Sequence, residues 1–262
     1  MTAIEPVIKA KRPEWGADER TSGGDRDGGT RGIGWAITES LATQGIHVAA
    51  GYSTNHEAAK TAFEKCHAAG WSVSVHQGNV GIPEDCRRVV GEVVTAHGRV
   101  DYLINNAGVT VDRSVRKMTI EEWHAVLRVN LSGAFYMIKA VLGHMMDRGA
   151  GRIVNITSLI GETGNIGQAN YAAAKAGLVG LTKTLALEMA PRGITVNCVS
   201  PGFTETDMLA SIPEKILAGV VERIPMQRLA SPGEIAHAVT LLDDRSGYIT
   251  GVALPVNGGM DM

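Results

Sequence analysis

Arg152-Ile-Val-Asn-Ile-Thr-Ser158, followed by Gly161 and then by Tyr171-Ala-Ala-Ala-Lys175, is the stretch that decides the fold. The first run is short, apolar and ends at a serine, which predicts a buried strand. The second run lies among good helix formers, so Tyr171 and Lys175 are expected on the same face of a helix. A strand followed by a helix is the repeating unit of a parallel α/β sheet. It would place the Ser158 hydroxyl at the carboxyl end of a strand, where open α/β sheets bind their ligands.

Tyr171 and Lys175 are therefore a candidate proton-donating pair. A phenol with an ordinary pKa of about 10 is a poor acid or base at neutral pH, and a neighbouring cation favours the phenolate. The spacing predicts that Lys175 lowers the pKa of Tyr171 toward the working range of a general acid. The same residue types at helical spacing are more often a surface pair than a catalytic one, so the assignment depends on the rest of the chain.

Strand and helix patterns alternate along the chain, which predicts a Rossmann-like α/β fold, a doubly wound parallel sheet flanked by helices. Strands are expected at residues 46–50, 71–75, 100–104, 153–157, 194–198 and 252–256. Helices are expected between Gly34 and Gly45 and at residues 55–69, 83–96, 119–146 and 171–190.

The C-terminal part shows a different pattern. Residues 202–230 contain Pro213 and Pro225 and no strand pattern, which indicates a helical substrate flap. Ser231 is expected to cap one more helix, with a proline at its first position. Pro255 lacks an amide proton, which predicts that the last strand lies at an edge of the sheet.

The strand that should open a nucleotide-binding sheet is missing from its expected place. Such a sheet begins with about five buried apolar residues that run into a glycine loop. Here that place holds Glu19-Arg-Thr-Ser-Gly-Gly-Asp-Arg-Asp-Gly28, which is charged and rich in glycine. We therefore divide the chain into an irregular or disordered segment, residues 1–26, and a single Rossmann-like domain, residues 27–262, with a degraded first strand. Either the strand is lost, or the segment comes from a shifted reading frame or another corrupted start, or other upstream residues replace it; the abrupt change at Gly28 favours a corrupted start.

Composition excludes several classes of function. A net charge of −2 with mixed signs gives no reason to expect nucleic-acid binding. Cys66, Cys86 and Cys198 lack metal-ligand spacing, so we expect neither a metal site nor a disulfide framework. No apolar run approaches the roughly 18 residues of a membrane span, and the first residues lack the hydrophobic region of a signal peptide. We therefore expect no membrane association and a cytoplasmic location.

Further motifs give the chain a family resemblance. In order and rough spacing it resembles the short-chain dehydrogenase/reductase family, from about Gly28 to the C-terminus. The motifs are Gly28-Gly-Thr-Arg-Gly32-Ile-Gly34, Asn105-Asn-Ala-Gly108, Asn130, Ser158, Tyr171 with Lys175, and Pro201-Gly202. Within that family it looks most like the acetoacetyl-CoA reductases and the 3-oxoacyl-acyl-carrier-protein reductases. This narrower likeness is carried by Arg116-Lys-Met-Thr, Gly167-Gln-Ala-Asn-Tyr171, Thr204-Glu-Thr-Asp-Met208 and Asn257-Gly-Gly-Met260. Asp27 departs from the family, which usually has Thr there.

The resemblance implies a set of catalytic residues, namely Asn130, Ser158, Tyr171 and Lys175. It implies that Tyr171 donates a proton to a ketone oxygen, that Ser158 hydrogen-bonds that oxygen, that Lys175 also holds the nicotinamide ribose, and that Asn130 completes a proton relay. The predicted reaction is the NADPH-dependent reduction of a 3-oxoacyl thioester, acetoacetyl-CoA or 3-oxoacyl-acyl-carrier protein, to the 3-hydroxyacyl thioester. The alternatives are a reductase of another small ketone and a catalytically impaired oligomeric scaffold. Similarity to the family also implies a homotetramer, assembled through the helices at 119–146 and 171–190.

The predicted cofactor is NADPH. NAD-binding versions of the fold carry an acidic residue at the end of the second strand, whereas Gly51-Tyr-Ser-Thr54 has no carboxylate and Arg31 offers a cation inside the glycine loop. Glycines in that loop let backbone amides approach the diphosphate. Together with this reasoning, the family resemblance implies the following cofactor-binding residues: Gly28, Thr30, Arg31, Gly32, Ile33, Gly34, Tyr52, Ser53, Asn79, Val80, Asn106, Ala107, Gly108, Tyr171, Lys175, Pro201, Gly202 and Thr206. Gln168 and Phe203 are the predicted substrate residues, at the acyl end of the pocket.

Overall fold

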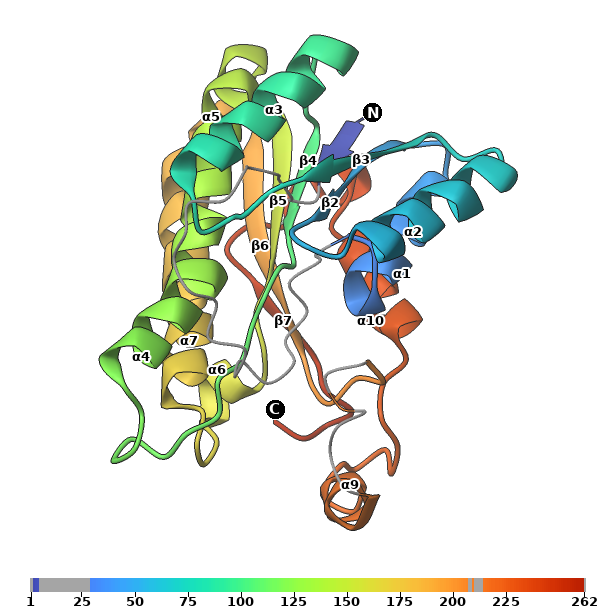
Figure 1. Ribbon diagram of the computed structural model, residues 1–262. Helices are drawn as coiled ribbons and strands as arrows, with labels where there is room; N and C mark the ends of the chain where they lie inside the picture. The colour runs from blue at the N-terminus through green and yellow to red at the C-terminus, as the bar shows by residue number, and fades with distance from the viewer. Residues whose placement is uncertain (1, 5–28, 207–208, 210–213, 262) are drawn as a thin grey trace.

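Seven parallel strands form one sheet in the order β3-β2-β1-β4-β5-β6-β7 (Figure 1). The computed structural model describes residues 2–4, 29–206, 209 and 214–261. The strands are β1 (Thr2–Ile4), β2 (His47–Tyr52), β3 (Val73–Gln77), β4 (Tyr102–Asn105), β5 (Gly151–Ile156), β6 (Ile194–Pro201) and β7 (Ala253–Val256). The chain runs outward from β1 to β3 and then returns to β4, so the strand order reverses between β1 and β4. Ligands of open α/β sheets bind at the carboxyl edge beside such a reversal.

Helices cover both faces of the sheet, as Figure 1 shows. One face carries α3 (Pro83–His97), α5 (Ala134–Arg148) and α7 (Ala169–Met189), and the other carries α1 (Gly32–Ala42) and α10 (Pro232–Thr240). The described residues also form α2 (His56–Ala68), α4 (Ile120–Leu127), α6 (Ile160–Thr163) and α9 (Glu214–Val221), with 3-10 turns at Ala190–Arg192 and Asp244–Ser246. Leu103 packs into the core on the α5 side and Ile104 into the core on the α1 side, because successive strand residues face opposite sides. The predicted doubly wound α/β fold is confirmed.

The sheet has a first strand between β2 and β4, which corrects the prediction that residues 1–26 are irregular throughout. Thr2–Ile4 form β1, and Ala3 pairs with Val48 of β2 on one side and with Tyr102 of β4 on the other. Without β1, the facing edges of β2 and β4 would each have a row of backbone donors and acceptors without sheet partners. The short strand β1 supplies hydrogen-bond partners to some of the groups on both edges. The predicted irregular segment therefore differs from the structure at Thr2–Ile4, and residues 5–26 lie outside the described residues.

A long helical run replaces the single helix expected at 119–146. It consists of α4, a π-helical turn at Arg128–Gly133 and α5. Among the described residues, Ile120–Arg148 is the one run long and apolar enough to cross a membrane, which the sequence patterns did not anticipate. Its buried side chains, among them Met137 and Val141, pack into the core beside α3. Packing in the core therefore accounts for the apolar side chains on the buried face of this run.

Several local predictions are confirmed at the C-terminal end. Ser231 caps α10, its hydroxyl accepts a hydrogen bond from the Glu234 amide, and Pro232 is the first helical residue. Strand β7 lies at the edge of the sheet, where Pro255 costs no ladder hydrogen bond to an outer neighbour. The predicted flap contains α9, and residues 207–208 and 210–213 of it lie outside the described residues.

Candidate active site

Ser158 and Tyr171 meet at the carboxyl edge of the sheet. Ser158 follows the end of β5 by two residues, and its hydroxyl lies close enough to the phenol of Tyr171, in the first turn of α7, to lower the pKa of that phenol through hydrogen bonding. The Ser158 oxygen also accepts a hydrogen bond from the Ile160 amide at 3.2 Å. The Tyr171 ring packs against a small apolar cluster that contains Val109 and Val111. These contacts hold the phenol oxygen and the serine hydroxyl side by side.

Lys175 lies one helical turn beyond Tyr171 and is almost completely buried, at 3% exposed. Its ammonium donates a hydrogen bond to the Ile156 carbonyl at 2.7 Å and lies 5.6 Å from the centre of the Tyr171 ring. Burial lowers the pKa of Lys175 from 10.5 to about 8, because the charged form loses hydration. Lys175 therefore still carries its proton at neutral pH, with a smaller margin than an exposed lysine.

The pKa of Tyr171 moves in the direction opposite to the prediction. Burial raises it, the hydrogen bond from Ser158 opposes that rise, and the negative charge of Asp112 adds to it. The Lys175 ammonium donates its hydrogen bond to the Ile156 carbonyl, and the effect of burial on the pKa of Tyr171 prevails. The predicted lowering of the Tyr171 pKa is wrong. Tyr171 is instead a protonated phenol at neutral pH, which is the form a proton donor requires.

Asn130 lies in the π-helical turn, and its side chain makes two hydrogen bonds to the backbone of Val109, in the segment after β4. Its amide oxygen accepts from the Val109 amide at 2.8 Å, and its amide nitrogen donates to the Val109 carbonyl at 2.9 Å. A β-carbon on Gly108 would lie 3.7 Å from both the Asn130 oxygen and the Lys175 nitrogen. The turn after β4 therefore brings Gly108, Asn130 and Lys175 together.

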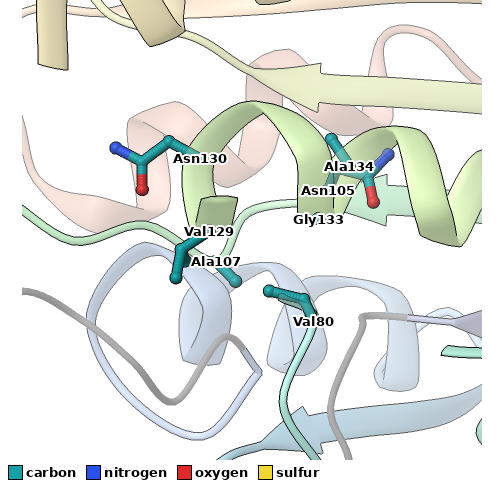
Figure 2. A pocket seen from close by; sticks show the side chains of 7 residues that line it. All are labelled: Val80, Asn105, Ala107, Val129, Asn130, Gly133 and Ala134. Atoms are coloured by element: carbon teal, nitrogen blue, oxygen red, sulfur yellow. The ribbon is translucent and has the colours of Figure 1, made fainter. Parts of the chain in front are cut away.

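A small cavity lies under the same turn (Figure 2). Its volume is about 10 Å³, which is about the space that one water molecule needs. Figure 2 shows the side chains of Val80, Ala107 and Val129 close together, with the amides of Asn105 and Asn130 on opposite sides of them. Two predicted cofactor residues, Val80 and Ala107, thus share a cavity wall with Asn130. Asn106, between Asn105 and Ala107, is half-buried.

The glycine loop fits the diphosphate of a dinucleotide. Helix α1 starts at Gly32, whose φ of 54° favours glycine, and no side chain caps its first amides at the Arg31 position. Uncapped amides at a helix N-terminus attract anions. The Thr30 hydroxyl is buried without a hydrogen-bond partner among the described residues, which leaves it available to a ligand. Ile33 and Gly34 continue the first turn of α1, and Gly28 lies outside the described residues.

The glycine loop and the end of β2 lie against each other. The Gly29 amide donates to the Gly51 carbonyl at 2.8 Å, which brings Arg31 toward the segment that holds Tyr52 and Ser53. The Ser53 carbonyl accepts from the Gln77 side chain at 3.0 Å, and the Tyr52 hydroxyl lies 3.4 Å from a His56 ring nitrogen.

Asn79 occupies the loop after β3, next to the cavity residue Val80. It is exposed, and its side chain accepts from the Gly81 amide at 2.9 Å. Its amide oxygen is therefore committed to its own loop, and Asn79 shapes the cavity wall through the backbone.

Pro201 ends β6 and Gly202 follows it, and Pro201 pairs with the segment after β5. The Pro201 carbonyl accepts from the Leu159 amide at 2.9 Å, and the Gly202 amide donates to the Val256 carbonyl at 2.9 Å. A β-carbon on Gly202 would lie 2.7 Å from the Asn257 α-carbon, so only glycine fits there. Phe203 and Thr206 come next in the chain and are half-buried.

Gln168 is held at the mouth of the site by a carboxylate that the sequence patterns did not single out. Its amide nitrogen donates to both carboxylate oxygens of Asp112, at 3.1 and 3.2 Å, and its oxygen accepts from Asn165 at 2.9 Å. Asp112 is close enough to Tyr171 to raise the pKa of the phenol. A carboxylate in an exposed loop carries no sequence signal for such a role, because most of them are solvated surface groups.

The described residues contain no group of three or more histidine, cysteine, aspartate or glutamate side chains placed to hold a metal ion. The site brings together a phenol, a hydroxyl and a buried ammonium at the carboxyl edge of a sheet whose glycine loop suits a dinucleotide.

Known proteins are similar to this chain in sequence. The sequence profile of a family described as enoyl-(acyl carrier protein) reductase matches residues 28–261. An acetoacetyl-CoA reductase of Shinella zoogloeoides is 45% identical over 234 residues, which cover 88% of this chain and 95% of that protein. A 3-oxoacyl-acyl-carrier-protein reductase of Staphylococcus epidermidis is 42% identical over 236 residues, 90% of this chain and 97% of that protein. The enzyme of the same name from Escherichia coli K12 is 45% identical over 236 residues, which cover 90% of this chain and 95% of that protein.

The chain belongs to the short-chain dehydrogenase/reductase family. It is an oxidoreductase that acts on a ketone or alcohol group.

Proposed function

We propose that this protein reduces a 3-oxoacyl thioester, acetoacetyl-CoA or 3-oxoacyl-acyl-carrier protein, to the 3-hydroxyacyl thioester with NADPH. The observation that carries the proposal is the meeting of the Ser158 hydroxyl, the Tyr171 phenol and the Lys175 ammonium at the carboxyl edge of the sheet. The substrate class is supported by the names of relatives that share 42% to 45% of their residues with this chain.

The chain's own residues would handle the ketone oxygen. When bound, the nicotinamide supplies a hydride to the ketone carbon. The Ser158 hydroxyl donates a hydrogen bond to the ketone oxygen, and Tyr171 gives its proton to that oxygen as negative charge develops there. The raised pKa of Tyr171 keeps the phenol protonated until that moment. The Lys175 ammonium, 5.6 Å from the ring centre, then stabilises the phenolate that remains.

Asn130 and Lys175 have a second task in this proposal. Lys175 holds the nicotinamide ribose, and Asn130 completes a relay that returns a proton to Tyr171. Their common position beside Gly108 supports this assignment, because both side chains lie against the turn after β4.

The preference for NADPH rests on charge. Arg31 lies in the glycine loop, and the Gly29–Gly51 hydrogen bond brings that loop to the end of β2, where Tyr52 and Ser53 replace the carboxylate of an NAD site. A charge-assisted hydrogen bond contributes about 1.5–3 kcal/mol, so Arg31→Ala should lower kcat/KM for NADPH by about tenfold or more and leave the value for NADH nearly unchanged. Equal losses with both cofactors would contradict the assignment.

The decisive test of the reaction compares three substrates with the purified protein and NADPH, followed by the loss of nicotinamide absorbance. Acetoacetyl-CoA and an acetoacetyl-acyl-carrier protein should be reduced, and their kcat/KM values identify the preferred carrier. Crotonyl-CoA, a 2-enoyl thioester, tests the reaction in the description of the matched family. Reduction of crotonyl-CoA alone would replace the proposal by enoyl reduction. Absence of NADPH binding, measured by fluorescence, would favour a non-catalytic role.

Substrate contacts are proposed for Gln168 and Phe203. Gln168 is three residues before Tyr171, and hydrogen bonds with Asp112 and Asn165 fix its side chain. It would therefore lie where a substrate approaches the Tyr171 phenol. Phe203 is half-buried at the start of the flap and offers an apolar surface to an acyl chain.

We propose that the protein is a cytoplasmic homotetramer that assembles through α5 and α7. Phe135 on α5 and Leu187 on α7 are 44% and 80% exposed, which is unfavourable for large apolar side chains unless another subunit covers them. Leu187→Glu should convert the tetramer to smaller species in size-exclusion chromatography with light scattering. A tetramer that survives this change would exclude α7 as the interface.

A further inference from the structure

Lys175 owes its position to a backbone carbonyl, that of Ile156 at the end of β5, 2.7 Å from its ammonium. The contact joins helix α7 to strand β5 at one point. A small slide of α7 along β5 would break it, because a hydrogen bond weakens steeply outside its narrow range of distance and angle. Something must therefore fix the relative position of these two elements.

The neighbouring residue on β5 supplies a second point of attachment. The Ile156 side chain packs on the α1 side of the sheet, so Asn155 faces the α7 side. The Asn155 amide nitrogen donates to the Thr182 hydroxyl at 2.8 Å. Thr182 lies seven residues after Lys175 on the same helix, about two turns away and on the same face. Helix α7 thus contacts consecutive residues of β5 through two side chains, Lys175 and Thr182.

The Asn155 side chain also contacts a third element, strand β4. The Asn155 oxygen accepts from the Asn105 side chain at 2.8 Å, and Asn105 is the last residue of β4, where the turn to Gly108 begins. Asn155 and Thr182 are 0% exposed and Asn105 is 5% exposed. Three polar side chains thus form a continuous string from the Asn105 turn through β5 to α7.

The burial of these three polar side chains indicates that they have a role besides filling space in the core. A buried amide or hydroxyl is unfavourable unless it is hydrogen-bonded, and apolar side chains of similar shape would fill the same space without that requirement. The string is therefore poorly explained by stability alone. Its hydrogen bonds do what apolar contacts do not: they are satisfied only in one register of α7 against β5 and β4.

We propose that Asn155 is a positioning residue, which fixes α7 against β5 and the Asn105 turn through Thr182 and Asn105 so that Lys175 and Tyr171 keep their catalytic positions. The inference rests on the proposed function of Tyr171 and Lys175. Among the described residues, the Asn155 side chain hydrogen-bonds Asn105 and Thr182 and neither the phenol oxygen nor the lysine nitrogen, so it acts on them through the backbone and through Thr182.

The test uses variants that differ in a few atoms. Thr182→Val removes the hydroxyl and keeps the shape, and Thr182→Ser keeps the hydroxyl and serves as the conservative rescue. Asn155→Leu removes the amide, and the double variant Asn155→Leu/Thr182→Val removes both ends of their hydrogen bond. Thr184→Val is the matched control, because Thr184 is exposed on the same helix and its hydroxyl bonds only to the Gly180 carbonyl at 3.1 Å.

The expected result separates kcat from stability. Thr182→Val and Asn155→Leu should each lower kcat for acetoacetyl-CoA reduction by about tenfold, a factor that a small misplacement of catalytic groups readily produces. The double variant should recover part of the melting temperature, because neither end of the Asn155–Thr182 hydrogen bond is left unpaired, although the Asn105 amide still lacks its acceptor, and it should not recover kcat. Thr182→Ser and Thr184→Val should stay within about threefold of the unchanged protein.

A second readout does not depend on turnover. The pKa of Lys175, measured by NMR of isotope-labelled lysine in the ligand-free protein, should rise from about 8 toward 10.5 in Thr182→Val as the ammonium gains hydration, and should not change in Thr184→Val. If the unchanged protein reduces no thioester, the proposed function fails while this measurement still tests the positioning role. Variants that lose melting temperature but keep kcat within about threefold, with an unchanged Lys175 pKa, would overturn the inference.

Discussion

Replacement of Lys175 by methionine should separate the stability of this protein from its activity. Methionine has nearly the length of lysine and no charge, and position 175 is 3% exposed. The lowering of the lysine pKa from 10.5 to about 8 corresponds to about 3 kcal/mol against the charged form in the folded protein. Removal of the ammonium leaves the Ile156 carbonyl without this donor, which costs about 1–3 kcal/mol. Near neutral pH the two effects nearly cancel, so Lys175→Met should be about as stable as the unchanged protein while it loses activity.

The pH dependence gives the sharper expectation. Below pH 8 the lysine is charged in both the folded and the unfolded chain, so the folded protein bears the full cost of burying the charge. Between pH 8 and 10.5 the folded protein has lost this proton while the unfolded chain still holds it, so stability rises with pH. Relative to Lys175→Met, the unchanged protein should therefore gain about 3 kcal/mol across that window.

The assay is urea unfolding of the ligand-free protein below pH 8 and near pH 10.5, at one protein concentration because an oligomer's stability depends on it. Thr184→Val, on the exposed side of α7, serves as the control for changes in the helix itself. A difference in unfolding free energy between the two proteins that stays constant with pH would refute the claim that Lys175 is a desolvated, titrating group.

Two other predictions concern Tyr171 and the packing of the π-helical turn. Asp112→Asn removes a charge that raises the pKa of Tyr171, so the alkaline loss of reductase activity, which follows deprotonation of the phenol, should move to lower pH; an unmoved pH profile would exclude Asp112 from this role. Gly133→Ala would place a β-carbon 2.8 Å from a Val80 methyl and should cost about 1–3 kcal/mol in thermal unfolding. Gly143→Ala, on the same helical run with nothing within 4 Å, should be neutral or slightly stabilising, and equal losses in both variants would contradict the packing argument.

Local spacing explains which parts of the fold were predictable. Tyr171 and Lys175 share a helix face because they are four residues apart, and Ser158 lies beside them because its strand ends at the same edge of the sheet. The alternation of apolar runs predicted six of the seven strands, and Pro255 predicted the position of β7 at the edge. Each of these features is set by neighbouring residues in the chain.

The features that escaped prediction depend on distant contacts. Thr2–Ile4 carry no pattern of their own, and they become a strand because β2 and β4 offer backbone partners on both sides. The π-helical turn at Asn130 is tied to the Val109 backbone, and nothing in a continuous helical pattern reveals it. The direction of the Tyr171 pKa depends on burial, which spacing along one helix does not measure.

The central claim is that the phenol of Tyr171 is the acid that completes ketone reduction. Tyr171→Phe keeps the ring that packs against Val109 and Val111 and removes only the hydroxyl. The account predicts a fall in kcat for acetoacetyl-CoA reduction of at least about 10²-fold, the usual contribution of a general acid, with NADPH binding unchanged by fluorescence titration. A variant that retains turnover near that of the unchanged protein would contradict the account.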